Sequence, residues 1–298
     1  MKILITGSNG LLGQHLVHLL LQHTSYQVIA TGKGPARFSF AASAALYQYV
    51  ELDITDAVAV HRVIQQYTPN IIIHAAAMTQ PDPCELHPVQ CWNINVTATR
   101  FLISAATAAK AYFIYVSTDF VFSGEAGPYK EEDATGPVNY YGSSKLAAEK
   151  AVMESDLHWA VVRTVLVYGN ILAGNRSNII TWVKENLENN RPIKVVNDQW
   201  RTPTYVKDLA KGILLLFQKK AAGIYHISGG ELMRPYDMAV AVADYLQLDK
   251  TLMTEVNAST FTQPAMRPLK TGFIIDKAVS KLGYQPTSFT TALKDMLG

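Results

Sequence analysis

The feature that most constrains the fold of this chain is a regular alternation of short apolar runs with longer amphipathic stretches in its first half. Apolar runs of strand length, rich in Ile, Val and Tyr, lie at Lys2–Thr6, Gln27–Thr31, Leu46–Val50, Asn70–His74, Tyr112–Ser117 and Trp159–Arg163. Stretches of helix length lie between them, at Leu11–Gln22, Asp56–Tyr67, Pro88–Lys110 and Tyr140–Ser155. Strands that alternate with helices form parallel sheets, and almost wholly apolar strands are covered on both faces. The sequence therefore predicts an α/β fold of the Rossmann type with a doubly wound parallel sheet.

The alternation fails after Tyr168, where a loop rich in Gly and Asn at 174–178 leads into a predicted helix near Ile179–Asn189. The elements expected further on are helices at Val206–Gln218, Tyr236–Leu246, Asp276–Leu282 and Thr290–Leu297, and a short strand at Ile224–Ile227. We expect residues 1–168 to form one domain, with 204–227 returning to it. Residues 169–203 and 228–298 are expected to form a smaller, discontinuous C-terminal lobe, with a cleft between the two.

Composition excludes several classes of function. The chain has 298 residues, of which 49% are hydrophobic and 17% charged, and a net charge of +2, with its basic residues scattered along the chain. This pattern indicates a globular protein and no binding of nucleic acid. No leader and no apolar run of about 20 residues is present, so we expect a cytoplasmic protein without a membrane partner. The spacing of Cys84 and Cys91 is not that of metal ligands, so reduced thiols and no metal site are expected.

A glycine-rich turn joins the first strand to the first helix. Its sequence is Gly7-Ser8-Asn9-Gly10-Leu11-Leu12-Gly13, with three glycines spaced by three residues. Glycine lets the backbone approach a ligand closely, Asn tolerates left-handed conformations, and the amides at a helix N-terminus attract a pyrophosphate. The turn therefore predicts a dinucleotide site. The residues assigned to it here are Gly7, Asn9, Gly10, Leu11, Leu12 and Gly13.

The residues after the second strand favour NADP(H) over NAD(H). An acidic residue there would bind the ribose 2′-hydroxyl of NAD, but the chain has Lys33 and Arg37, which can neutralise a 2′-phosphate. An alternative is that both are solvated loop cations. Further along, Asp53 and Ile54 follow the third strand and are placed to meet adenine. Small side chains follow the fourth strand where the nicotinamide half must lie close to the backbone, at Ala75, Ala76 and Ala77.

The strongest chemical signal is the pair Tyr141 and Lys145, which are four residues apart on one helix face. An ammonium beside a phenol lowers the pKa of the phenol, which can then exchange a proton with a carbonyl oxygen near neutral pH. Val116 and Thr118 lie at the carboxyl end of the fifth strand, the edge where open α/β sheets bind ligands, and the Thr118 hydroxyl can polarise a carbonyl.

Together these residues resemble the extended short-chain dehydrogenase/reductases, and within them the dTDP-4-dehydrorhamnose reductase family. The similar stretches are Ile73–Ala77, Ser117–Phe122, Tyr140–Glu149 and Asn197–Gln199 with Pro203-Thr204. The resemblance implies an NAD(P)-binding first domain, a substrate-binding lobe, a nucleotide-sugar substrate reduced at its 4-keto group, and a homodimer. It makes Tyr141 the proton donor, Lys145 its partner and a cofactor-ribose ligand, and Asp119 a neighbour of the sugar.

Other substrate contacts are expected from the lobe. Leu166 stands in the segment where that family places an aromatic residue near the sugar, which is a departure from the pattern. Arg201 and Arg267 are candidate phosphate contacts, because Arg binds phosphate through two donors. The alternative for each is an ion pair between the lobes, and both readings stay open.

Three alternatives to a reductase differ in how well the sequence suits them. The stretches Trp200–Asp208 and Met266–Pro268 also resemble the regulatory β subunits of methionine adenosyltransferase, which bind NADP and act as partner proteins. A non-catalytic NADP-binding subunit therefore stays open, as does a nucleotide-sugar 4-epimerase, which uses the same Tyr and Lys. A 4,6-dehydratase is disfavoured, because Phe120 follows Asp119 where that branch has Glu.

Overall fold

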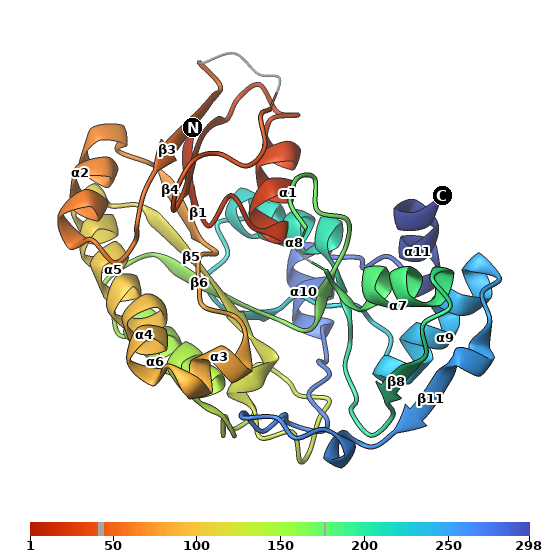
Figure 1. Ribbon diagram of the computed structural model, residues 1–298. Helices are drawn as coiled ribbons and strands as arrows, with labels where there is room; N and C mark the ends of the chain where they lie inside the picture. Colours follow the sequence, from red (N-terminus) through yellow and green to blue (C-terminus); the bar gives the residue numbers. More distant parts are fainter. Residues whose placement is uncertain (41–44, 176) are drawn as a thin grey trace.

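The centre of the protein is a parallel sheet of seven strands (Figure 1). The computed structural model describes residues 1–40, 45–175 and 177–298. The strand order is β10-β6-β5-β4-β1-β2-β3. The strands are β1 (Lys2–Thr6), β2 (Gln27–Gly32), β3 (Tyr47–Glu51), β4 (Ile71–His74), β5 (Tyr112–Thr118), β6 (Trp159–Thr164) and β10 (Gly223–His226). The predicted doubly wound sheet is confirmed, and β10 extends it beyond the six strands of the first half.

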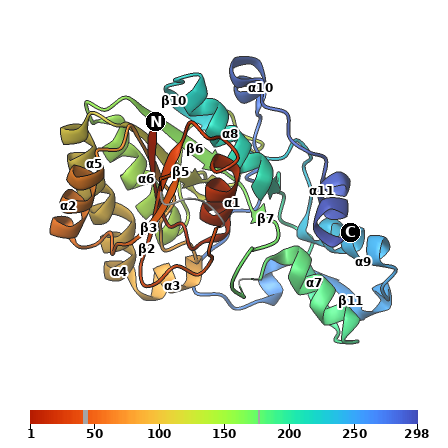
Figure 2. The same cartoon turned by 90° about the horizontal axis from the view of Figure 1, so that it is seen from above.

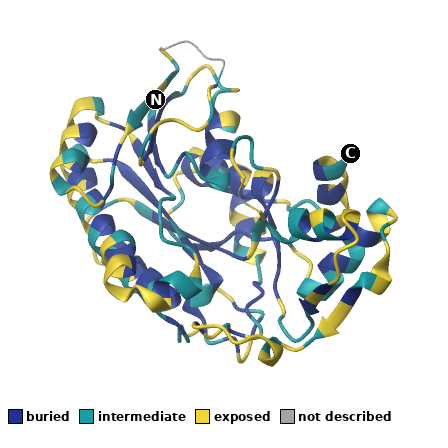
Figure 3. Ribbon diagram, in the orientation of Figure 1, coloured by how far each residue is buried: buried dark blue, intermediate teal, exposed yellow. Residues whose placement is uncertain are grey.

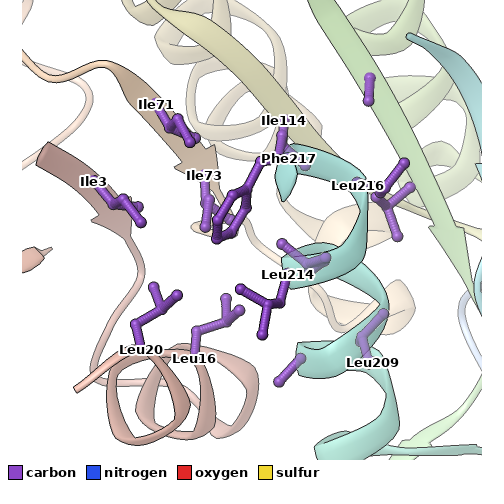
Figure 4. Close-up of a cluster of buried hydrophobic side chains, with 14 of the residues drawn as sticks. Ile3, Leu16, Leu20, Ile71, Ile73, Ile114, Leu209, Leu214, Leu216 and Phe217 are labelled. Atoms are coloured by element: carbon purple, nitrogen blue, oxygen red, sulfur yellow. The ribbon is translucent and has the colours of Figure 1, made fainter. Parts of the chain in front are cut away.

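Helices cover both faces of this sheet (Figure 2). On one face lie α1 (Leu11–Leu20), α8 (Val206–Gln218) and α10 (Asp276–Leu282). On the other lie α2 (Ala57–Tyr67), α5 (Ala98–Ala109) and α6 (Tyr140–Met153). Figure 4 shows the first core, in which Ile3 and Ile73 of the sheet face Leu16 of α1. Each such side chain contributes about 1.5–3 kcal/mol when fully buried, which fixes the sheet and its carboxyl edge.

The predicted helix over Pro88–Lys110 is confirmed, with one irregular turn inside it. After the short helix α3 (Pro81–Leu86), helical structure continues without a gap through α4 (Pro88–Trp92), a π-helical turn η1 (Asn93–Thr97) and α5. The wide turn brings the buried amide of Asn95 to the backbone of Met78, whose N–H donates to Oδ1 at 2.8 Å and whose carbonyl accepts from Nδ2 at 3.0 Å. Nδ2 also donates to the Ser144 hydroxyl at 2.9 Å. Side-chain bonds of this kind stabilise the wide turn within the helix, and such turns are frequent at functional sites.

The residues that were predicted to form the C-terminal lobe pack beside the sheet as a smaller group of helices and strands. It contains α7 (Ile179–Glu188), β8 (Ile193–Val196), α9 (Pro235–Leu246), η3 (Lys250–Leu252), β11 (Met253–Val256), η4 (Ala258–Thr260) and α11 (Phe289–Leu297). Three short elements connect it to the sheet, namely η2 (Asp119–Val121), β7 (Val167–Tyr168) and β9 (Thr204–Tyr205). Figure 3 shows that its helices bury one side and expose the other. The division into two domains at the predicted boundaries stays a prediction.

The helix starts follow local signals in the sequence. Asp56 caps α2 by accepting from Ala59 N, and Asn178 caps α7 in a reciprocal arrangement with Thr181. The loop predicted at 174–178 is described except for residue 176, which lies outside the described residues. Over the ranges that the structure describes, no helix has the length and apolar character needed to cross a membrane.

Candidate functional site

Two adjoining cavities follow the carboxyl edge of the sheet, and both are lined by Gly7 and Ala77. The first, which we call the Lys33 cavity, has a volume of about 710 Å³. The second, the Tyr141 cavity, has a volume of about 530 Å³. Predicted residues that line the first are Gly7, Lys33, Asp53, Ile54, Ala76 and Ala77. Those that line the second are Gly7, Gly10, Leu11, Leu12, Gly13, Ala75, Ala77, Val116, Thr118, Asp119, Tyr141, Lys145, Leu166, Arg201 and Arg267.

The glycine turn forms the wall shared by the two cavities. Gly7 has φ of +74°, a left-handed conformation that favours glycine. A Cβ on Gly13 would lie 2.3 Å from the carbonyl oxygen of Gly7, so the first turn of α1 can pack there only without a side chain. Gly10 caps α1, whose free N-terminal amides open on the Tyr141 cavity. This backbone cradle fits a pyrophosphate at the N-terminus of the helix.

Asn9 and Arg37 line neither cavity, which corrects the reasoning about Asn9. Asn9 does not adopt the left-handed conformation for which it was singled out. Its amide instead ties the turn to the next loop, since Nδ2 donates to Pro35 O at 3.1 Å and to the Tyr49 hydroxyl at 3.0 Å. Its Oδ1 accepts from the backbone N–H of Arg37 at 2.9 Å. Asn9 therefore shapes the loop that carries Lys33.

Lys33 and Asp53 form an ion pair at the mouth of the Lys33 cavity, with Nζ 2.8 Å from Oδ2. The bond from Lys33, together with two bonds from Thr55, lowers the pKa of Asp53 to about 2. The pKa of Lys33 is raised by the same carboxylate. Since 83% of the Lys33 side chain is exposed, its ammonium is free to turn toward an anion in the cavity.

Tyr141 and Lys145 lie together in the Tyr141 cavity, both on α6 and both buried. The Tyr141 ring meets Phe120 edge to face at 5.7 Å between centroids. Lys145 Nζ donates to the carbonyl oxygen of Val116 at 2.7 Å and lies 4.1 Å from the centre of the Tyr115 ring. Burial lowers the pKa of Lys145 to about 7. The two side chains thus reach the end of β5 with fixed geometry.

Thr118 and Asp119 are linked to the lobe behind them. The Thr118 hydroxyl donates to Asp119 Oδ1 at 3.1 Å, and the hydroxyl of Thr271 donates to Oδ2. Arg201 Nε lies 3.7 Å from the same Oδ2. Burial raises the pKa of Asp119, against the opposing effect of Arg201. The carboxylate therefore has its partners inside the protein while it borders the cavity.

The two arginines are also held by protein groups. Arg201 donates to the carbonyl oxygens of Leu269 and Pro268, at 2.9 and 2.6 Å, and burial lowers its pKa. Arg267 forms a two-pronged ion pair with Asp82 of α3. The ion pair that the sequence left open as an alternative is present for both arginines, with Asp82 for Arg267 and with Asp119 for Arg201. Leu166 has φ of +36° and a side chain that lines the cavity.

Several lining residues were not anticipated. The far wall of the Lys33 cavity comes from α4 and η1, with His87, Pro88, Val89, Gln90, Asn93 and Ile94. The Tyr141 cavity also contains Thr79, Thr164, Ser177, Asn178, Gln199 and Pro235. The repeated prolines at 81, 83 and 88 and the capping residue Asn178 were available signals for these segments.

Comparisons with known proteins agree with this geometry. The family model described as the RmlD substrate binding domain matches residues 1–298. The methionine adenosyltransferase 2 subunit beta of Mus musculus is 34% identical over 99% of this chain and 87% of its own length. A dTDP-4-dehydrorhamnose reductase of Aggregatibacter actinomycetemcomitans is 32% identical over 99% of this chain and 98% of its own.

Two solved structures extend the likeness to three dimensions. A dTDP-4-dehydrorhamnose reductase from Clostridium acetobutylicum superposes with a TM-score of 0.87 at 29% identity, covering 100% of this chain and 98% of that one. Another from Bacillus anthracis, solved in complex with NADP, has a TM-score of 0.84 at 28% identity and covers 99% of this chain and 98% of that one.

Proposed function

The chain belongs to the RmlD substrate binding domain family of extended short-chain dehydrogenase/reductases, and from that premise we propose that it reduces the 4-keto group of a nucleotide-activated deoxysugar with NADPH. The observation that carries the proposal is the meeting of Tyr141, Lys145 and Thr118 in one cavity with the glycine turn. This arrangement provides a proton donor, its charged partner and a dinucleotide cradle at the same sheet edge.

Tyr141 is the proton donor in this proposal. NADPH, when bound, supplies a hydride to C4 of the sugar. The Tyr141 hydroxyl gives its proton to the carbonyl oxygen, which would otherwise become an alkoxide. Lys145 stabilises the phenolate that remains, because an ammonium one helical turn away lowers the cost of that charge. The Thr118 hydroxyl and the apolar wall at Phe120 orient the carbonyl and exclude water.

The fit of the cofactor rests on the turn itself. A Cβ on Gly13 would collide with the Gly7 carbonyl oxygen, and Gly7 is left-handed, so the turn packs against the start of α1 as bare backbone and leaves the helix N-terminus at the cavity. Lys33 supports NADP(H) over NAD(H), since its exposed ammonium borders the cavity and can pair with a 2′-phosphate. Lys33 would then leave its ion pair with Asp53, and Asp53 would be available to contact the adenosine half of the cofactor.

For the sugar, Leu166, Arg201, Arg267 and Asp119 are proposed contacts around the Tyr141 cavity. The test is isotopic. We expect NADPH deuterated on the transferred position to give a product of dTDP-4-keto-6-deoxy-L-mannose that carries the deuterium at C4, as read by mass spectrometry and NMR. A product without deuterium at C4, or none at all, would contradict the proposal.

A second candidate has its own support, because several relatives at 33–34% identity over 99% of this chain are β subunits of methionine adenosyltransferase 2. This function would need NADPH binding without turnover. Its test is co-elution of the NADPH-loaded chain with a methionine adenosyltransferase catalytic subunit. A shared peak that requires NADPH would support it, and separate peaks at micromolar concentration would count against it. A 4-epimerase would retain NAD through dialysis, whereas a reductase releases its cofactor.

A further inference from the structure

Four buried side-chain atoms have no hydrogen-bond partner among the residues that the structure describes. They are Tyr115 Oη, Ser117 Oγ, Asn197 Oδ1 and His226 Nε2. A buried polar atom without a partner costs free energy, so each such atom calls for an explanation. Of these four residues, Ser117 alone lines one of the two cavities described above, the Tyr141 cavity. The partner of the Ser117 hydroxyl is therefore to be sought among molecules that bind in that cavity.

The strand β5 determines the direction of the Ser117 side chain. Side chains alternate between the two faces of a strand, so Ser117 lies on the same face as Phe113 and Tyr115, which pack in the core under α5 and α6. Lys145 of α6 reaches this face, since its Nζ lies 4.1 Å from the centre of the Tyr115 ring. Ser117 is thus on the side of β5 from which α6 brings Tyr141 and Lys145 to the cavity. A serine has one side-chain torsion, so rotation about it is enough to turn the buried hydroxyl toward the cavity that the residue lines.

The neighbouring hydroxyl, that of Thr118, is already used inside the protein. It donates to Asp119 Oδ1 at 3.1 Å and accepts from the backbone N–H of Phe120 at 3.3 Å. A threonine hydroxyl carries a single proton, so in this arrangement Thr118 has no proton left for a ligand. Ser117, by contrast, has its proton available. At the end of β5 it is therefore the hydroxyl that is equipped to donate to a bound acceptor.

We propose that the Ser117 hydroxyl donates a hydrogen bond to a carbonyl oxygen of a molecule bound in the Tyr141 cavity. A carbonyl oxygen only accepts hydrogen bonds, so it requires a donor of this kind. The inference rests on the proposed function, which supplies two such oxygens, the 4-keto group of the sugar and the carboxamide of the nicotinamide. The two sources are distinguished by which ligand loses affinity when the hydroxyl is removed.

The test compares Ser117→Ala with Ser228→Ala. Ser228 is a matched control because it is also buried, but its hydroxyl donates to the Gly229 carbonyl at 3.0 Å and accepts from Thr202 at 3.1 Å. Ser228 lines neither of the two cavities. For each protein we would measure the melting temperature without ligand, the affinity for NADP⁺, and the affinity of the NADP⁺ complex for dTDP-4-keto-6-deoxy-L-mannose. NADP⁺ has no hydride to transfer, so these affinities do not depend on turnover, and kcat with NADPH is measured separately.

Ser117→Ala should leave the melting temperature unchanged or raise it, because the hydroxyl has no protein partner to lose. If the partner is the 4-keto oxygen, the variant should bind the keto sugar about tenfold more weakly and have a lower kcat. If the partner is the carboxamide, it should instead bind NADP⁺ about tenfold more weakly. Ser228→Ala should show the reverse pattern, with a lower melting temperature and both affinities within about twofold of the wild-type values.

Two results overturn the inference. One is that both affinities and kcat of Ser117→Ala stay within about twofold of the wild-type values, which would assign a buried water to the hydroxyl. The other is a lower melting temperature with equal losses of both affinities, as expected if the hydroxyl supports the fold. A loss of keto-sugar affinity in Ser117→Ala, with no turnover by the wild-type protein, supports the inference and contradicts the reductase function instead. If the wild-type protein binds NADP⁺ but no keto sugar, the proposed function fails and the NADP⁺ affinity of Ser117→Ala alone decides the inference.

Discussion

Arg267 and Asp82 join two segments that are 185 positions apart in the chain, with Arg267 Nη2 2.7 Å from Asp82 Oδ2. Asp82 also accepts from the backbone N–H of Ala265 at 3.0 Å, and Arg267 Nη1 donates to the Ala265 carbonyl. The pair thus ties α3 to the segment before Pro268 at the rim of the Tyr141 cavity. The Arg267 side chain is 17% exposed, and Arg267 lines the Tyr141 cavity.

This geometry predicts opposite effects for the two partners. Arg267→Met should weaken the binding of dTDP by roughly tenfold, because a charge-assisted contact to phosphate is lost. Asp82→Asn should leave dTDP affinity unchanged or increase it, since it frees the guanidinium for phosphate. Isothermal titration with dTDP measures both. Equal losses of affinity in the two variants would mean that the pair only holds the rim together.

Gly13 should tolerate no side chain. In Gly13→Ala the new Cβ would lie 2.3 Å from the Gly7 carbonyl oxygen, whereas in Gly10→Ala the same contact is 3.3 Å. Overpacking of this kind costs about 1–3 kcal/mol, and relief requires the glycine turn to shift relative to the N-terminus of α1. We expect Gly13→Ala to lose NADPH affinity by at least about tenfold. Gly10→Ala, the matched control, should lose clearly less, as fluorescence titration would show.

Lys33 should determine the preference for NADPH, and Arg37 should not. Lys33 lines its cavity, while the side chain of Arg37 lines neither cavity. Lys33→Ala is expected to reduce the affinity for NADPH by roughly five- to tenfold and to leave that for NADH unchanged, because only NADPH carries the 2′-phosphate. Arg37→Ala is the control with the same change of charge. Equal effects of the two variants on NADPH would show that long-range charge, and not contact, sets the preference.

His74 should make the fold sensitive to acid. Its two ring nitrogens lie 2.7 and 3.0 Å from the hydroxyls of Thr6 and Thr99, and burial lowers its pKa from 6.5 to about 3. The unfolded chain therefore binds a proton at this residue that the folded chain does not, and the free energy of unfolding falls as the pH falls below 6.5. The slope is about 1.4 kcal/mol per pH unit. His226 is also buried with its pKa lowered to about 3 and adds a similar slope. Urea denaturation at pH 7 and 5 measures the sum, and His74→Gln should reduce the slope by about 1.4 kcal/mol per pH unit whatever its effect on stability at pH 7; an unchanged slope would contradict the assignment.

Much of the fold could be predicted from local pattern. The apolar runs that became β1, β4 and β5 are buried on both faces, so composition and length alone identified them. The π-helical turn η1 inside the predicted helix could not be predicted, because it depends on the bonds of Asn95 to Met78 and Ser144, and Ser144 is 49 residues away. The helix propensities of neighbouring residues carry no information on a contact between side chains 49 positions apart.

In the candidate site, too, local spacing identified some residues, while those that depend on long-range packing were missed. Tyr141, Lys145 and the glycines were identified because their spacing within one helix or turn sets their geometry. Asn9 was singled out for its backbone, yet its side chain binds a loop 26 residues away. The wall formed by α4 was missed, since it reaches the cavity only through the packing of α4 and η1 beside α6.

The most direct test of the central claim is the loss of NADPH absorbance with dTDP-4-keto-6-deoxy-L-mannose, for the wild-type chain beside Tyr141→Phe. Removal of the proton donor should reduce kcat by at least about 100-fold while the affinity for NADPH stays within twofold of the wild-type value. Tight NADPH binding by the wild-type chain without turnover on this or related keto sugars would contradict the reductase account and favour a regulatory NADPH-binding subunit.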